Sequence, residues 1–156
     1  MTAALETPIA HCQAVVAQLM ARHDWQLLHA AEFSQRLLAR VPVNGAFDLA
    51  TLTRAAVNLY CEAWHEACHR VGEPQRRAYA ELAHYLYDRA LHKYGDPETA
   101  REITHEALIL VHQQLDQCRS PGVFLAFVQF KLWHAATTYF RQRNRWAAHV
   151  APGGRR

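Results

Sequence analysis

One stretch of the chain has the residue types and spacing of a zinc hydrolase. His65-Glu66-Ala67-Cys68-His69 places two imidazoles four residues apart, so a helix would bring both to one face, with Glu66 available as a general base. The extended form of this pattern has its third ligand at the position of Gln75, and an amide is not a usual zinc ligand. Three interpretations stay open: a small zinc-dependent HExxH metallo-hydrolase, a structural metal site made of Cys61, His65, Cys68 and His69, or an amphipathic helix with ordinary histidines.

The other short enzyme signatures are missing from the sequence. It contains no glycine-rich phosphate loop, no Gly-x-Ser-x-Gly elbow and no Cys-x-x-Cys pair. We therefore expect a protein that is not an enzyme and that needs no cofactor and no metal. The four cysteines are scattered among helix-forming residues, and no apolar run is long enough to cross a bilayer. Reduced thiols and a cytoplasmic location without membrane contact are expected.

The charges are distributed unevenly along the chain. Its 156 residues include 17 Lys and Arg against 14 Asp and Glu, a formal net charge of +3. All 14 acids lie in residues 1–116, whereas residues 117–156 hold seven bases and no acid. A segment without carboxylates attracts phosphates, and arginine, which supplies 15 of the 17 bases, pairs with phosphate and stacks on nucleic-acid bases. The last quarter of the chain therefore predicts a nucleic-acid partner, although a general arginine bias would also explain the excess of Arg over Lys.

The elements that must position these residues are expected to be helices. Gly and Pro fall between periodic apolar segments and strand-like alternation is absent, so the fold class is all-α, a compact multi-helix domain. The first predicted helix starts at Pro8 with Thr7 as N-cap, and the second runs from about Asp24 towards Arg40. The third and fourth run from Asp48 to Gly72 and from Glu73 to Tyr94. The last two run from Asp96-Pro97 to Leu115 and from Phe124 to Arg145. Residues 147–156 are expected to form a flexible basic tail.

Three segments in the second half of the chain carry a family resemblance. They are Tyr79–Leu91, Gly95–Leu108 with its Gly-Asp-Pro-Glu turn, and Leu115–Phe127 with its Phe-Leu-Ala-Phe helix start. In this order and spacing they resemble region 2 of bacterial RNA polymerase sigma factors of the extracytoplasmic-function (ECF) group. The resemblance implies a protein of transcription initiation, with a sigma region 2-like helical bundle over residues 73–146. Residues 1–72 are then an N-terminal helical extension of unknown role.

The resemblance implies two binding surfaces. One helix matches the sigma helix that docks on the clamp helices of the largest subunit of the RNA polymerase core, which gives the predicted polymerase-binding residues Glu102, Ile103, His105, Glu106, Ile109 and His112. The loop and the last helix match the part that holds the melted non-template strand of −10 promoter DNA. They give the predicted nucleic-acid-binding residues Cys118, Arg119, Lys131, Trp133, His134, Tyr139, Arg141, Arg143 and Arg145. Planar side chains and cations of this kind are what unpaired DNA requires.

Several positions depart from the family pattern. His105 replaces a Gln, His134 replaces an Asn of the melting helix, Thr138 replaces an Asp, and Phe130 and Trp133 stand where basic residues are common. These departures leave open a degenerate sigma-fold module that regulates by binding another protein. The chain also has no match to the second helix-turn-helix domain (region 4) of sigma factors. Recognition of upstream DNA is therefore expected to need another DNA-targeting or regulatory protein.

Overall fold

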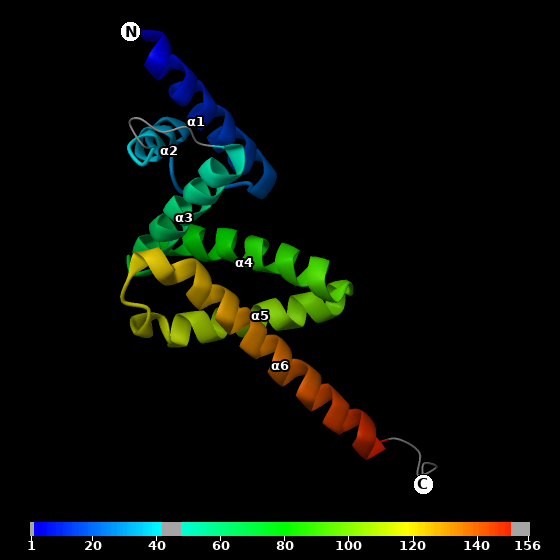
Figure 1. Ribbon diagram of the computed structural model, residues 1–156. Coiled ribbons are helices and arrows are strands. Elements are labelled where there is room, and N and C mark those ends of the chain that lie inside the picture. The colour runs from blue at the N-terminus through cyan, green and yellow to red at the C-terminus, as the bar shows by residue number, and fades with distance from the viewer. Residues whose placement is uncertain (1, 42–47, 151–156) are drawn as a thin grey trace. The chain divides into compact units, whose positions relative to one another are not determined.

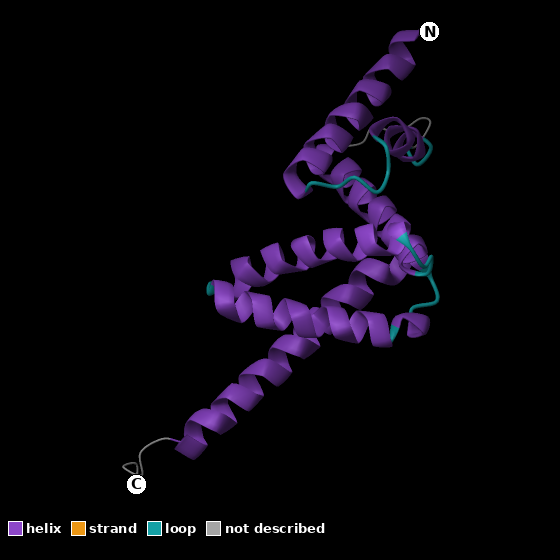
Figure 2. Cartoon of the chain, turned by 180° about the vertical axis from the view of Figure 1, so that it is seen from behind, coloured by secondary structure: helices purple, strands orange, loops and turns teal. Residues whose placement is uncertain are grey.

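The computed structural model describes residues 2–41 and 48–150, and helices make up most of both ranges. The elements in chain order are α1 (Thr2–His23), α2 (Ala30–Leu38), α3 (Leu49–Cys68), α4 (Glu73–Tyr94), α5 (Pro97–Gln113), the short 3-10 helices η1 (Leu115–Gln117) and η2 (Pro121–Val123), and α6 (Phe124–Val150) (Figure 1). The described ranges contain no strand, as the colouring of Figure 2 shows. The all-α prediction is confirmed.

Two helix starts follow directly from capping chemistry. The Asp48 carboxylate accepts a hydrogen bond from the Thr51 backbone N–H at 2.7 Å, and the Asp96 carboxylate accepts one from the Thr99 N–H at 2.8 Å. The pKa of the Asp48 carboxyl is lowered by hydrogen bonds from the Thr51 side chain and backbone, and that of Asp96 by hydrogen bonds from the Thr99 backbone and side chain, because these bonds stabilise the ionised form. Both caps satisfy N–H groups that have no partner within the helix. The predicted starts of α3 and α5 are therefore confirmed.

The predicted start of the first helix is wrong. The helix begins at Thr2, and Pro8 lies inside it instead of at its first position. The four residues Ala3 to Glu6 all have high helix propensity, so the helix extends upstream of the proline. A proline so near the N-terminal end removes only one backbone hydrogen bond from the helix.

The predicted start of the second helix is also wrong, because residues 24–29 form a connection. Asp24 has a left-handed backbone with φ of 56°, and the Trp25 N–H bonds back to the Met20 carbonyl at 3.1 Å. This geometry closes the end of α1, a place where glycine is usual and aspartate is less common. Trp25 is then buried, and α2 begins only at Ala30.

The end of the last helix differs from the prediction as well. α6 continues to Val150, so residues 147–150 are helical and do not belong to a flexible tail. Ala147 and Ala148 favour this continuation, since alanine is the strongest helix former. Residues 151–156, the remainder of the predicted tail, lie outside the described residues.

The backbone contacts group the described residues into two units. The first holds the residues up to His84 together with Ser120–Leu125, and the second holds Tyr85–Arg119 together with the part of α6 from Ala126. The first turns of α4 thus belong with α1, α2 and α3, whereas the sequence prediction placed all of α4 in the second domain.

A buried carboxylate holds the first unit together. Glu81 on α4 is only 7% exposed and accepts hydrogen bonds from Tyr60 Oη at 2.6 Å, Trp64 Nε1 at 3.1 Å and the Gln26 backbone N–H at 2.5 Å. Trp25 stacks on Tyr60 with ring centroids 4.1 Å apart. Burial and the neighbouring Glu81 carboxylate raise the pKa of Tyr60, which stays a hydrogen-bond donor. The network ties α3 and α4 to the connection that follows α1.

The second unit is built on an apolar interior from three helices. The side chains of Leu86 on α4, Ile103 and Val111 on α5, and Val128 and Leu132 on α6 are all buried. These residues recur at helical spacing within α5 and α6, so each helix has one buried face and leaves the opposite face to solvent. A candidate binding residue on α5 or α6 is therefore accessible to a partner only if it lies on the solvent face of its helix.

Candidate nucleic-acid interface

α5 presents most of the residues predicted to bind polymerase on one exposed face. Glu102, His105, Glu106 and His112 are exposed and Ile109 is half-buried, at the spacing that brings side chains to one side of a helix. Ile103 is a correction, because its side chain is completely buried. It follows Glu102 directly and so points away from that face, into the interior with Ala107 and Val111.

The loop before α6 offers one exposed candidate instead of two. Arg119 is exposed, whereas Cys118 is only 4% exposed. The Cys118 N–H donates to the Leu115 carbonyl at 3.0 Å, which closes η1 and turns the thiol inward. The prediction that Cys118 contacts nucleic acid is therefore wrong for this conformation.

α6 carries an exposed cluster of aromatic rings, which we call the aromatic platform and define as Phe130, Trp133 and His134. Phe130 is 56% exposed and Trp133 is 52% exposed. Their rings stack with centroids 5.7 Å apart and an interplanar angle of 29°, and the His134 ring lies 6.4 Å from Phe130. Trp133 and His134 were predicted as binding residues. Phe130 was not, although its position three residues before Trp133 places both on one helix face.

Two arginines continue the face of the aromatic platform towards the C-terminal end of α6. Arg141 and Arg145 follow His134 at intervals that return to the same side of a helix. Every side chain from Arg141 to Ala148 is exposed, and Figure 1 shows these last turns extending past α5. The whole of α6 contains no acidic residue.

Tyr139 and Arg143 lie on a different side of α6. Arg143 Nη1 donates to Tyr139 Oη at 3.5 Å, and the same hydroxyl lies 3.5 Å from Thr99 Oγ1 at the start of α5. The charge of Arg143 also contributes to the lowered pKa of Asp96, after the hydrogen bonds from Thr99. These two predicted binding residues are thus engaged with the cap of α5, away from Arg141.

Lys131 is the third predicted residue that the structure does not present to solvent. It is 9% exposed, and its ammonium group donates a hydrogen bond to Gln114 Oε1 at the end of α5. The same nitrogen lies 5.0 Å from the ring centroid of Phe127 and 5.6 Å from that of Phe130. Gln114 was missed by the sequence prediction, since no sequence pattern connects residues 17 positions apart on two helices.

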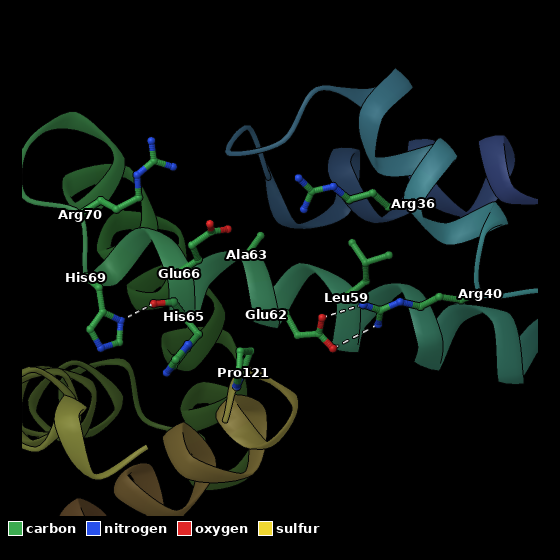
Figure 3. A pocket seen from close by; sticks show the side chains of 10 residues that line it. All are labelled: Arg36, Arg40, Leu59, Glu62, Ala63, His65, Glu66, His69, Arg70 and Pro121. Atoms are coloured by element: carbon green, nitrogen blue, oxygen red, sulfur yellow. Dashed lines mark hydrogen bonds and ion pairs between the residues drawn. The ribbon is translucent and has the colours of Figure 1, made fainter. Parts of the chain in front are cut away.

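The zinc-hydrolase motif lines a hollow of about 540 Å³ in the first unit (Figure 3). The rings of His65 and His69 are 4.8 Å apart, and His69 Nδ1 lies 2.8 Å from the His65 carbonyl oxygen. Glu62, one turn before His65, is held by Arg40 through contacts of 2.6 and 3.2 Å. The residues that line this hollow are Arg36, Arg40, Leu59, Glu62, Ala63, His65, Glu66, His69, Arg70 and Pro121.

The donor set of this hollow does not complete a metal centre. In the ranges that the structure describes, no group of three or more His, Cys, Asp or Glu side chains is arranged to hold a metal ion. Cys61 and Cys68 are buried, and burial raises the pKa of each thiol to about 12. Neither metal interpretation of this motif gains a third ligand from the fold.

The chain was also compared with known proteins. No protein-family model, no curated protein and no solved structure matches it. No helix in the described part of the chain is long and apolar enough to cross a membrane.

Proposed function

We propose that the chain is a sigma-like transcription factor that engages partly single-stranded promoter DNA with α6 and binds the RNA polymerase core through α5. The observation that carries this proposal is the exposed aromatic platform, continued by Arg141 and Arg145 on a helix without acids. The resemblance of residues Tyr79–Phe127 to sigma region 2 supports the proposal as well, through the order and spacing of its three segments.

The aromatic platform supplies the chemistry for unpaired bases. Stacking of one base on an aromatic side chain contributes about 1–3 kcal/mol and requires an accessible ring face. Phe130 and Trp133 are large apolar rings that are each more than half exposed, which is unfavourable unless a ligand covers them. A base in a duplex is already stacked and paired, so this surface favours single strands.

The arginines supply the chemistry for the DNA backbone. Four residues of helix span about 6 Å, so Arg141 and Arg145 offer two guanidinium groups in a row along the same face. Arginine binds phosphate through two parallel hydrogen bonds, and a helix without carboxylates does not repel the strand. Along α6, the residues proposed to stack on bases therefore come before the arginines proposed to bind phosphate.

The proposal predicts separable effects of two kinds of variant on binding of a labelled single-stranded oligonucleotide. Trp133→Ala removes a stacking surface, so affinity is expected to fall about tenfold with an unchanged salt dependence. The pair Arg141→Gln and Arg145→Gln is expected to make the plot of log affinity against log salt shallower by about 0.7 per arginine. Arg22→Gln on α1 is the matched control and should change neither quantity. Wild-type protein with no preference for single strands over duplex would contradict the proposal.

The polymerase part of the proposal rests on the exposed face of α5. Glu106→Arg reverses a charge on this face and is expected to abolish co-purification with RNA polymerase core, while Glu73→Arg on α4 should not. Wild-type protein that does not associate with core enzyme would remove this part of the function.

A second candidate function is a sigma-fold module that regulates by binding another protein. The exposed rings of Phe130 and Trp133 favour it as well, because contiguous apolar surface is also typical of protein interfaces. Promoter-dependent transcription by purified protein and core polymerase would exclude this candidate. Absence of DNA binding, together with a stable complex with a protein partner, would favour it.

A further inference from the structure

Lys131 is buried although it carries a charge, and its contacts explain how. The Lys131 residue is only 9% exposed, so the desolvation of its charge must be offset by other partners. Gln114 Oε1 accepts one of its hydrogen bonds, and the ring faces of Phe127 and Phe130 attract the remaining positive charge. All of these partners lie in the second unit, on α6 or at the end of α5.

One of these partners is itself part of the aromatic platform. Phe130 contacts Lys131 with one ring face and stacks on Trp133. An exposed aromatic side chain otherwise exchanges among rotamers, and ordering it on binding has an entropic cost. A cation over the ring is a directional contact, so it favours one orientation of the Phe130 ring.

We propose that Lys131 is a positioning residue that fixes Phe130, and through it Trp133, for base stacking, and that it does not contact phosphate. This inference rests on the proposed function of α6. To contact a phosphate, Lys131 Nζ would have to give up its hydrogen bond to Gln114 and its contacts with both rings. Arg141 and Arg145 are exposed and would lose no such contacts.

Lys131→Met tests this role, because methionine keeps the unbranched stem and removes the charge. The full chain is titrated with a short labelled oligothymidylate and with a strand of the same length that contains abasic sites. We expect about fivefold weaker binding of the base-bearing strand, unchanged binding of the abasic strand and an unchanged salt slope. Lys131→Arg should restore most of the affinity. Arg141→Gln is the matched control and should weaken both strands with a shallower slope.

A second variant and a measurement without DNA complete the test. Gln114→Leu leaves Lys131 in place but removes its acceptor, so it should reduce the preference for the base-bearing strand in the same direction. In both variants, nuclear Overhauser contacts between the Phe130 and Trp133 rings are expected to weaken. Equal loss for both strands with a slope lower by about 0.7 would overturn the inference, since that result marks a phosphate contact. Unchanged ring contacts would overturn it too. If wild-type protein binds neither strand, the proposed function fails, while weakened ring contacts would still support the positioning role.

Discussion

Replacing Glu81 by alanine is expected to lower the free energy of unfolding by about 3–5 kcal/mol. The carboxylate accepts three hydrogen bonds, and two of its donors, the Tyr60 hydroxyl and the Trp64 indole N–H, are on buried side chains. Leaving a buried donor without an acceptor costs about 1–3 kcal/mol, so these two donors account for most of the expected loss. Gln26 is exposed, and water can replace the acceptor of its backbone N–H.

Glu81→Gln sharpens the test. The glutamine carbonyl can still accept from Tyr60 and Trp64, but its amide nitrogen then faces the Gln26 N–H, donor against donor. We expect a loss of about 1–2 kcal/mol, between the wild type and the alanine variant.

The measurement is urea unfolding followed by circular dichroism and tryptophan fluorescence, since Trp64 reports on the network directly. Glu73→Gln is the matched control on the same helix: its side chain is 65% exposed and pairs with Arg76, so its loss should stay below about 0.5 kcal/mol. An alanine variant within about 1 kcal/mol of wild type would show that Glu81 is not a buried acceptor for these donors.

Three further predictions follow from the second unit and the cysteines. Asp96→Ala should lower the urea midpoint of unfolding, because it removes the acceptor that caps the Thr99 N–H at the start of α5. Folding lowers the pKa of Asp96 below its usual 3.8, so the cap stabilises the protein above pH 3.8, and this stabilisation is lost as the pH falls through the lower pKa of the folded state. An Asp96→Ala effect that is equal at pH 7 and pH 2 would contradict this pH dependence. Ile103→Ala should cost about 2–4 kcal/mol, whereas Glu106→Arg should leave the unfolding midpoint nearly unchanged, and a reversed order would show that the two faces of α5 are misassigned. All four cysteines are buried, so a thiol reagent should react slowly with native protein at pH 8 and quickly in urea; rapid reaction before unfolding would contradict the burial.

Several helix ends could be predicted because they carry local signals. Asp48, Asp96-Pro97 and Gly95 act within a few residues, and Gly95 has the left-handed backbone, with φ of 81°, that its position after α4 requires. The same local rules failed at Asp24, where an aspartate takes the left-handed backbone that usually indicates glycine. They also failed at Pro8, because strong helix formers upstream of this proline extend the helix to Thr2, although proline is usual at the start of a helix.

The candidate site could be predicted only as far as helical periodicity reaches. Periodicity places Trp133, Arg141 and Arg145 on one face of α6, and it places Ile103 on the apolar face of α5, where its side chain is buried. The burial of Lys131 depends on its hydrogen bond to Gln114. The burial of Glu81 depends on its hydrogen bonds from Tyr60, Trp64 and Gln26. Such contacts join distant residues, and charge alone would have placed both side chains in solvent.

Photo-cross-linking can show whether α6 contacts the melted promoter strand. Promoter DNA with an unpaired −10 region is prepared with a photoreactive thymine analogue in the non-template strand and is bound by the full chain together with polymerase core. We expect a cross-link that maps to residues 130–145 of α6 and that is lost in Trp133→Ala but kept in Arg22→Gln. A cross-link that maps only to α1, α2 or α3, or a yield that is the same on fully paired DNA, would contradict it.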